Sequence, residues 1–280
     1  MLENINPINV VKTTKEVLPL TINSLDNAGS SIVNIINTIL TPFDIANLYT
    51  EHAKAKFANK LKSKLNNIPP ENRYEPKLSI IGPVIDNLKY NLNEENLHDM
   101  YANLLAKSCN SKLAENILPI FAEILKQIAP LETTILPTFL STDTGYSICD
   151  IRLQKKGQYY NRYNHKLHNK SILRNYNEGL DIFSNYFPYN LHNISSEKLS
   201  LMIDNWLRLK LIEIDEHVYT SEDSYYNFYY DENTKRIITN YKAKYKNINF
   251  DDEDYEPAHI PKSIKPTLLG RNFYNICIKD

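Results

Sequence analysis

Two consecutive helical stripes of apolar residues constrain the fold of this chain more than any other feature. The first stripe comprises Leu97, Met100, Tyr101, Leu104 and Leu105. The second stripe comprises Ile117, Ile120, Phe121, Ile124, Leu125 and Ile128. Spacings of three and four residues place each set on one face of an α-helix. Asn93 suits the N-cap of the first helix, and Pro130 suits the first turn of a further helix through Phe139. Because the connections are short, we expect these helices to pack as an antiparallel bundle.

The region before these stripes is also predicted to be helical. Residues 30–43 carry an apolar stripe, Pro42 divides or kinks that helix, and the continuation over 44–65 ends at Ile68-Pro69-Pro70. A further helix is expected from Lys77 to Tyr90, with a kink or a restart at Gly82 and Pro83. Polar residues interrupt the most apolar segment, 32–48, and a spanning helix needs about 20 nearly uninterrupted apolar residues. We therefore expect no transmembrane helix.

The pattern changes after Leu140. Ile148, Ile151 and Leu153 indicate a short strand, and Ser195 or Ser196 can cap a helix whose apolar face includes Trp206. The sequence LKLIEID follows, then the aromatic runs HVYT and YYNFYY, which together favour a β-hairpin beside that helix. TLLGRNFYNICI is predicted to form a final helix.

These patterns predict a mainly α protein with a helical N-terminal bundle and a smaller α+β, winged-helix-like C-terminal domain. The expected organisation is a loose arm over 1–29, a helical domain over 30–140, a basic, Tyr-rich connection or insertion over 141–193, and the C-terminal domain over 194–280.

Composition narrows the class of protein. The 280 residues carry a formal net charge of −1, so any attraction to nucleic acid or anionic lipid must come from a local patch. The cysteines Cys109, Cys149 and Cys277 form no CxxC pair, which fits a reducing cytosol and argues against a zinc module. The first residues show no secretory signal pattern, so we expect a cytoplasmic location.

One local patch stands out, from Arg152 to Arg174. It contains seven Arg or Lys residues and no acidic residue, and tyrosines are interleaved with the cations. Cations can contact phosphates and tyrosines can stack on bases, so the patch is a candidate nucleic-acid interface. The alternative is a solvated loop without a partner. The candidate binding residues are Lys155, Lys156, Tyr159, Tyr160, Arg162, Tyr163, Lys166, Lys170 and Arg174.

The same patch contains weaker candidates for chemistry. Arg162 and His168 match the Arg–(four to six residues)–His spacing of HEPN ribonucleases, in which such a pair acts on the 2′-hydroxyl and the scissile phosphate. Here Tyr163 follows the arginine where a small polar residue is usual. His165 and His168 could share a metal ion, but their basic surroundings would repel a cation. We expect no metal site and no cofactor, and we find no convincing catalytic motif.

Three segments resemble a known family. The chain resembles the Abi-alpha (abortive infection alpha) family of bacterial proteins in three sequence segments. These segments are IPPENRYEPKLSIIGPVIDNLKY, DMYANLLAKS and ILPIFAEILKQIAPLE. The resemblance covers about residues 32–140, is strongest over 68–132, and returns in TLLGRNFYNICI. It implies a role in phage defence and supplies no reaction. Leu118 stands where we expect a histidine.

Most of the matching residues form turns or a core and therefore define a fold rather than a site. They are Pro69, Gly82, Pro83, Leu104, Leu105, Pro119, Phe121 and Gln127. Glu75, Lys126 and Gln127 are the polar exceptions, for which an ion pair or a helix-end contact is the simplest explanation.

The sequence thus favours a non-enzymatic sensor or effector of abortive infection that binds a protein or nucleic-acid partner, including one made by the phage. Self-association is compatible with this prediction. One alternative is a HEPN-like ribonuclease toxin. Another is a membrane-perturbing effector acting through the stripe at 30–43, although the polar face of that stripe lacks the Lys and Arg that favour anionic lipid.

Overall fold

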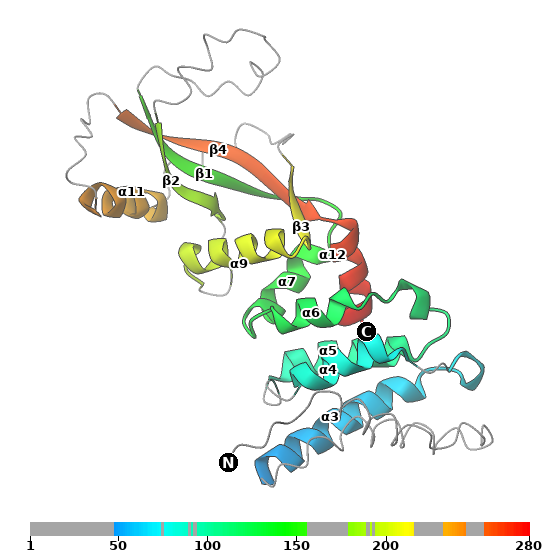
Figure 1. Ribbon diagram of the computed structural model, residues 1–280. Helices are drawn as coiled ribbons and strands as arrows, with labels where there is room; N and C mark the ends of the chain where they lie inside the picture. The colour runs from blue at the N-terminus through cyan, green and yellow to red at the C-terminus, as the bar shows by residue number, and fades with distance from the viewer. Residues whose placement is uncertain are drawn as a thin grey trace, which may run out of the picture. The chain divides into compact units, whose positions relative to one another are not determined.

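The computed structural model describes residues 48–73, 76–88, 91, 94–155, 179–188, 191, 194–215, 232–244 and 255–280 (Figure 1). Contacts divide the chain into two compact units, residues 1–123 and 124–280. We call them the N-terminal unit and the C-terminal unit and describe each by itself. The predicted arm over 1–29 and the predicted stripe over 30–43 lie outside the described residues.

The described part of the N-terminal unit is helical, as predicted. Its elements are α3 (Leu48–Asn66), the short 3-10 turn η2 (Pro70–Asn72), α4 (Leu78–Leu88), α5 (Glu95–Ser108), the 3-10 turn η3 (Ala114–Asn116) and the first residues of α6 (Ile120–Lys126). Helix α3 ends just before Ile68-Pro69-Pro70, where the sequence predicted a stop. Helix α4 continues through Gly82 and Pro83, so the predicted restart of the helix does not occur there.

Helix α5 forms the centre of this unit. All five residues of the predicted first stripe are buried, and so are His98, Ala102 and Asn103 on other sides of the helix. A helix that is buried on several sides is an interior helix rather than a surface one. Helix α5 begins one residue later than the Asn93 cap implies, because Glu94 occupies the N-cap.

The C-terminal unit combines helices with one antiparallel sheet. Its elements are α7 (Glu132–Leu140), β1 (Tyr146–Lys155), β2 (Gly179–Tyr186), α9 (Ser196–Arg208), β3 (Ile212–Asp215), α11 (Glu232–Lys244), β4 (Tyr255–Pro266), α12 (Leu268–Phe273) and a π-helical turn, η5 (Tyr274–Ile278). The predicted strand around Ile151 is therefore confirmed as β1. The predicted cap of α9 is confirmed too, because the Ser195 hydroxyl accepts a hydrogen bond from the Lys198 N–H at 3.3 Å.

The strand order in the sheet is β2-β1-β4-β3. Strand β1 pairs with β4 along its whole length, from Tyr146↔Ile264 to Lys155↔Tyr255. Strand β3 also pairs with β4, from Ile212↔Pro266 to Asp215↔Ser263. The runs HVYT and YYNFYY of the predicted hairpin lie outside the described residues, so the winged-helix arrangement stays a prediction.

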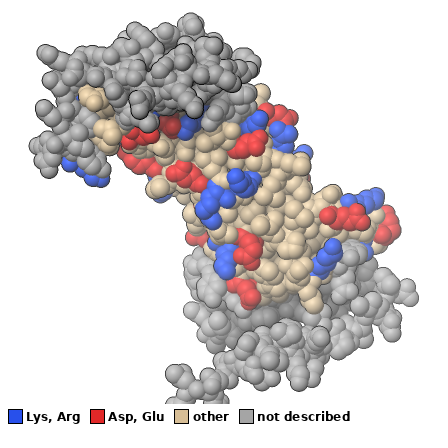
Figure 2. Space-filling view, turned by 45° about the horizontal axis from the view of Figure 1, so that its top comes forward, with Lys and Arg blue, Asp and Glu red and all other residues tan. Residues whose placement is uncertain are grey.

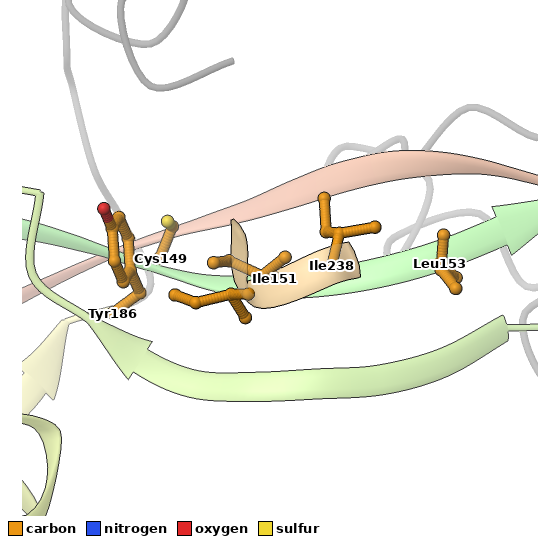
Figure 3. Packing of buried hydrophobic residues seen from close by; sticks show 6 residues of the cluster. Cys149, Ile151, Leu153, Tyr186 and Ile238 are labelled. Carbon is orange, nitrogen blue, oxygen red and sulfur yellow. The ribbon is translucent and has the colours of Figure 1, made fainter. Parts of the chain in front are cut away.

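One face of the sheet carries an apolar core. Cys149, Ile151 and Leu153 alternate along β1 and are fully buried, and they cluster with the buried Tyr186 of β2 and Ile238 of α11 (Figure 3). Helices α9 and α11 both contact β2, and they lie on the same side of the sheet (Figure 1). This alternation follows from the two-residue period of a strand, which sends successive side chains to opposite faces.

An aromatic cluster joins α7 and α9 to the sheet. The ring of Phe139 on α7 lies 4.8 Å from Tyr146, 5.4 Å from Phe187 and 5.1 Å from Trp206 on α9, measured between ring centroids. Such tilted contacts are the preferred geometry of aromatic pairs. The apolar face predicted for the helix containing Trp206 is therefore the face that binds the rest of the unit.

Candidate functional site

The predicted nucleic-acid interface joins two neighbouring strands. Residues 156–178 connect β1 to β2, and the residues at the two ends of this connection are paired, Gln154 with Gly179. Of the predicted binding residues, only Lys155 belongs to a described element, as the last residue of β1. The following predicted residues lie outside the described residues: Lys156, Tyr159, Tyr160, Arg162, Tyr163, Lys166, Lys170 and Arg174, together with His165 and His168.

Beside this connection, the sheet presents paired charges. Arg152 on β1 lies 3.7 Å from the Asp181 carboxylate on β2, and Lys262 on β4 forms an ion pair with Asp150 on β1. The side chains of Arg152, Asp150 and Lys262 are largely buried. Arg152 belongs to the basic stretch in the sequence, but in the structure its charge is partly neutralised by Asp181. Arg152 therefore offers an anion a weaker attraction than an unpaired arginine would.

A polar contact at the end of β2 was missed by the sequence analysis. Asn185 has a positive φ of 54°, a conformation that Asn tolerates better than most residues. Its backbone N–H donates to the Asp150 carboxylate at 3.0 Å, and its side-chain Nδ2 donates to Asp204 Oδ1 on α9 at 2.6 Å. The only sequence signal is an Asn near a strand end. The contact turns the chain and ties β2 to α9.

A second polar network holds the other side of α9. Asn205 Nδ2 donates to the Gln127 carbonyl at 3.1 Å and to Glu132 Oε1 at 3.0 Å, while Arg208 donates to Gln127 Oε1 at 2.9 Å. Glu132 is only 3% exposed, and its other oxygen accepts the Ala129 N–H at 2.6 Å. The simplest explanation offered for Gln127, a helix-end contact, is therefore confirmed.

The chain that follows α9 is held by α12. Thr267 caps α12 by accepting the Gly270 N–H at 2.9 Å, and its hydroxyl donates to the Lys210 carbonyl at 2.5 Å. A Cβ atom on Gly270 would lie 1.9 Å from the Leu211 carbonyl oxygen, so only glycine permits this approach. We call Gln127, Glu132, Thr267 and Gly270 the α9 seat.

The thiols are poor candidates for chemistry. Cys109, Cys149 and Cys277 are all buried and form no disulfide. Burial raises the pKa of Cys109 to about 12 and raises the pKa of Cys149 as well. Because the thiolate is the reactive form, neither thiol is activated as a nucleophile at neutral pH.

The described residues contain no group of three or more His, Cys, Asp or Glu side chains that could hold a metal ion. Within the same residues, no helix is long and apolar enough to cross a membrane. On the face shown in Figure 2, the described Lys and Arg side chains are interspersed with Asp and Glu. The described surface in that view therefore offers a mixed field rather than a patch of one sign.

The family model described as abortive infection alpha matches residues 49–277. The chain belongs to this family. The match includes both units, so it extends beyond the segments that carried the resemblance in the sequence. Comparisons with curated proteins and with solved structures found no match.

The residues that resemble the abortive infection alpha family can now be placed in the structure. All four residues of the α9 seat belong to the segments that resemble the family. Leu118, which stands where we expected a histidine, is 42% exposed. Its side chain is therefore not required for core packing. Lys126 is exposed, and Glu75 lies outside the described residues.

Proposed function

We propose that this protein acts in phage defence by abortive infection, as a non-enzymatic sensor or effector that binds a nucleic-acid or protein partner through its C-terminal half. Membership of the abortive infection alpha family supports the biological role. The chemistry of the residues between β1 and β2 favours a nucleic acid as the partner. A protein partner is the outcome to consider if nucleic acid is not bound.

The observation that carries the proposal is the position of the basic, Tyr-rich residues. They follow β1 and precede β2, two strands paired side by side on the apolar core of the C-terminal unit. Connections mounted on a rigid sheet are frequent sites of binding, because the scaffold positions them and their sequence is free to vary. Lys and Arg would contact phosphates, and Tyr159, Tyr160 and Tyr163 would stack on bases.

Several polar groups of the described residues have structural roles. Glu132, Asn205 and Gln127 bond to one another and to helix ends. Asp150 is paired with Lys262. These groups are occupied in holding α9 and the sheet together. The proposal needs the connection between β1 and β2, and it does not need the winged-helix-like arrangement predicted for residues 194–280.

The test is fluorescence anisotropy with labelled single-stranded RNA and DNA, titrated with the full chain at several salt concentrations. A triple variant, Lys156→Glu, Arg162→Glu and Lys166→Glu, reverses three charges of the connection. The matched control reverses three exposed lysines of the N-terminal unit, Lys62→Glu, Lys77→Glu and Lys112→Glu, and so changes the net charge equally.

We expect the wild type to bind, and its affinity to fall as salt rises, because phosphate contacts release counterions. The connection variant should bind at least about tenfold more weakly than the control variant, since it loses local phosphate contacts rather than overall charge. Wild-type protein that binds neither nucleic acid at low salt would rule out the nucleic-acid partner. Equal weakening in both variants would show that the connection is not the interface.

A further inference from the structure

A buried histidine lies at the centre of the contact between α3 and α5. His98 on α5 is 2% exposed, and its ring meets the edge of Phe57 on α3 at a centroid distance of 5.6 Å and an interplanar angle of 74°. The ring has a hydrogen bond to the backbone of Asn91. Its Nε2 atom is buried and has no hydrogen-bond partner among the described residues. The site therefore accommodates a neutral ring, and no acceptor for a second ring N–H lies among the described residues.

Ion pairs surround this contact and link the same two helices. Lys60 on α3 lies 2.7 Å from Asp99 and 3.5 Å from Glu95 on α5, and Lys56 lies 3.0 Å from Glu95. We call His98, Phe57 and these four charged residues the α3–α5 clasp. Of the described elements, α5 is the one that α3 contacts most extensively. The clasp is thus part of the most extensive contact that α3 makes with the described elements.

The charges of the clasp act on His98 in opposite directions. Burial lowers the pKa of His98, and the positive charges of Lys60 and Lys56 lower it further. The Asn91 backbone and the Asp99 carboxylate oppose this shift without reversing it. A proton on Nε2 would therefore place an unsatisfied cation in the core, beside another cation.

We propose that the α3–α5 clasp is acid-sensitive, so that protonation of His98 releases α3 from the rest of the N-terminal unit. Release lets the imidazolium reach water and relieves its repulsion by Lys60, at the expense of the Phe57 contact and the surrounding ion pairs. The exposed Lys56–Glu95 pair opposes this only weakly, because such a pair contributes little to stability, and the less exposed Lys60–Asp99 pair opposes it more. Acidification of the surroundings would then expose the buried face of α3, which carries Phe57, Leu61 and Leu65.

Hydrogen exchange measured by mass spectrometry on the full chain tests the proposal, with rates corrected for the intrinsic effect of pH. In the wild type, residues 55–66 of α3 should lose protection as the pH falls below about 6.5, the ordinary pKa of histidine. Because one proton is bound, the corrected exchange rate should rise by at most about tenfold per pH unit. Peptides from β1 and β4 serve as an internal reference and should not follow this change.

Two variants separate His98 from its neighbours. His98→Phe should abolish the pH dependence in α3, because phenylalanine fills the space and takes no proton. His98→Gln replaces it if that variant does not fold. Asp99→Asn keeps the histidine and should keep the pH dependence. The proposal would be overturned if protection of α3 in the wild type did not vary with pH. It would also be overturned if α3 of the His98 variants lost as much protection on acidification as α3 of the wild type.

Discussion

The α3–α5 clasp and the α9 seat both attach a helix, but they differ in whether their buried polar group has hydrogen-bond partners. In the seat, the buried carboxylate of Glu132 accepts hydrogen bonds from Ala129 and Asn205. In the clasp, Nε2 of the buried His98 has no partner among the described residues, and the surrounding charges are partly exposed. A satisfied buried network fixes one geometry, whereas an unsatisfied titratable group makes the attachment depend on pH. The difference predicts a permanent attachment for α9 and a conditional one for α3.

The largest effect is expected at the tightest point of the α9 seat. Gly270→Ala would place a methyl group 1.9 Å from the Leu211 carbonyl oxygen and 3.2 Å from Leu140 Cδ2, so the chain must shift. We expect a loss of at least about 3 kcal/mol in the free energy of unfolding, measured by urea denaturation.

A second helical glycine provides the control for this change. A Cβ atom on Gly82 would meet nothing within 4 Å. Gly82→Ala should stay within about 1 kcal/mol of the wild type, because alanine favours a helix while Pro83 disfavours a side chain just before it. Equal effects at the two glycines would contradict the role given to the Leu211 approach.

The next largest effect is expected from the carboxylate of the seat. Glu132→Ala leaves the part-buried Ala129 N–H without its acceptor and leaves the Asn205 amide with the Gln127 carbonyl alone. We expect the free energy of unfolding to fall by about 1–2 kcal/mol, because one part-buried donor loses its acceptor and a second donor loses one of its two partners. The double variant Glu132→Ala with Asn205→Ala should be less destabilised than the sum of the two single changes, since the two residues share the interaction. Strict additivity would show that they do not.

The effect of pH on stability should distinguish the two attachments. The pKa of His98 is lowered in the folded protein, so the unfolded chain binds the proton more readily. Its contribution to stability is therefore complete above pH 6.5 and is lost as the pH falls from 6.5 towards the folded pKa. The thermal midpoint of the wild type should drop over this range, and His98→Phe should reduce that drop. A midpoint with the same pH dependence in both proteins would remove His98 from the account.

The smallest effect is expected at the rim of the clasp. Lys56 pairs with Glu95 at 3.0 Å, and their side chains are 48% and 61% exposed. Lys56→Met should leave the thermal midpoint at pH 7.5 unchanged within error, since solvent screens such a pair. The pKa of Glu95 is lowered by Lys56 and Lys60, so what this carboxylate contributes is lost only below pH 4.5, outside the range of His98. A clear drop of the thermal midpoint at pH 7.5 would show that the Lys56–Glu95 pair contributes more to stability than this account assigns to it.

Helix α5 was predictable because its apolar periodicity is strong. The second predicted stripe was only partly right, because α6 covers Ile120–Lys126 alone and Ile120 is 49% exposed. The stripe from Leu97 to Leu105 and the stop after α3 were both confirmed. Strand β2 was missed because Gly179, Asp181 and Asn185 interrupt its apolar pattern.

Strand β4 was missed because it contains proline. Pro257 and Pro261 argue against a strand, yet β4 pairs with β1 along its length. The two prolines are four residues apart, so they have the same orientation in the strand. Strand β3 pairs with β4 only from residue 263 onwards. Both prolines precede that point, so the positions where they lack an N–H can face the side of β4 on which β3 does not pair.

The polar partners of the structure could not be read from the sequence. Glu132 and Asn205 are 73 residues apart, and no local pattern links them. His98 lies between two residues of the apolar stripe, Leu97 and Tyr101, a position that marks it as buried but does not show its lack of a partner. The predicted interface is a compositional signal, and all of its residues except Lys155 lie outside the described part of the chain.

The most direct test of the account is phage plating, with survival of infected cells at high multiplicity, on a host that carries the gene. The wild type should reduce plaque numbers while infected cells die. The triple charge reversal at Lys156, Arg162 and Lys166 should abolish this protection, and the matched reversal at Lys62, Lys77 and Lys112 should retain it. Full protection by the first variant, at wild-type protein levels, would contradict defence through the connection between β1 and β2.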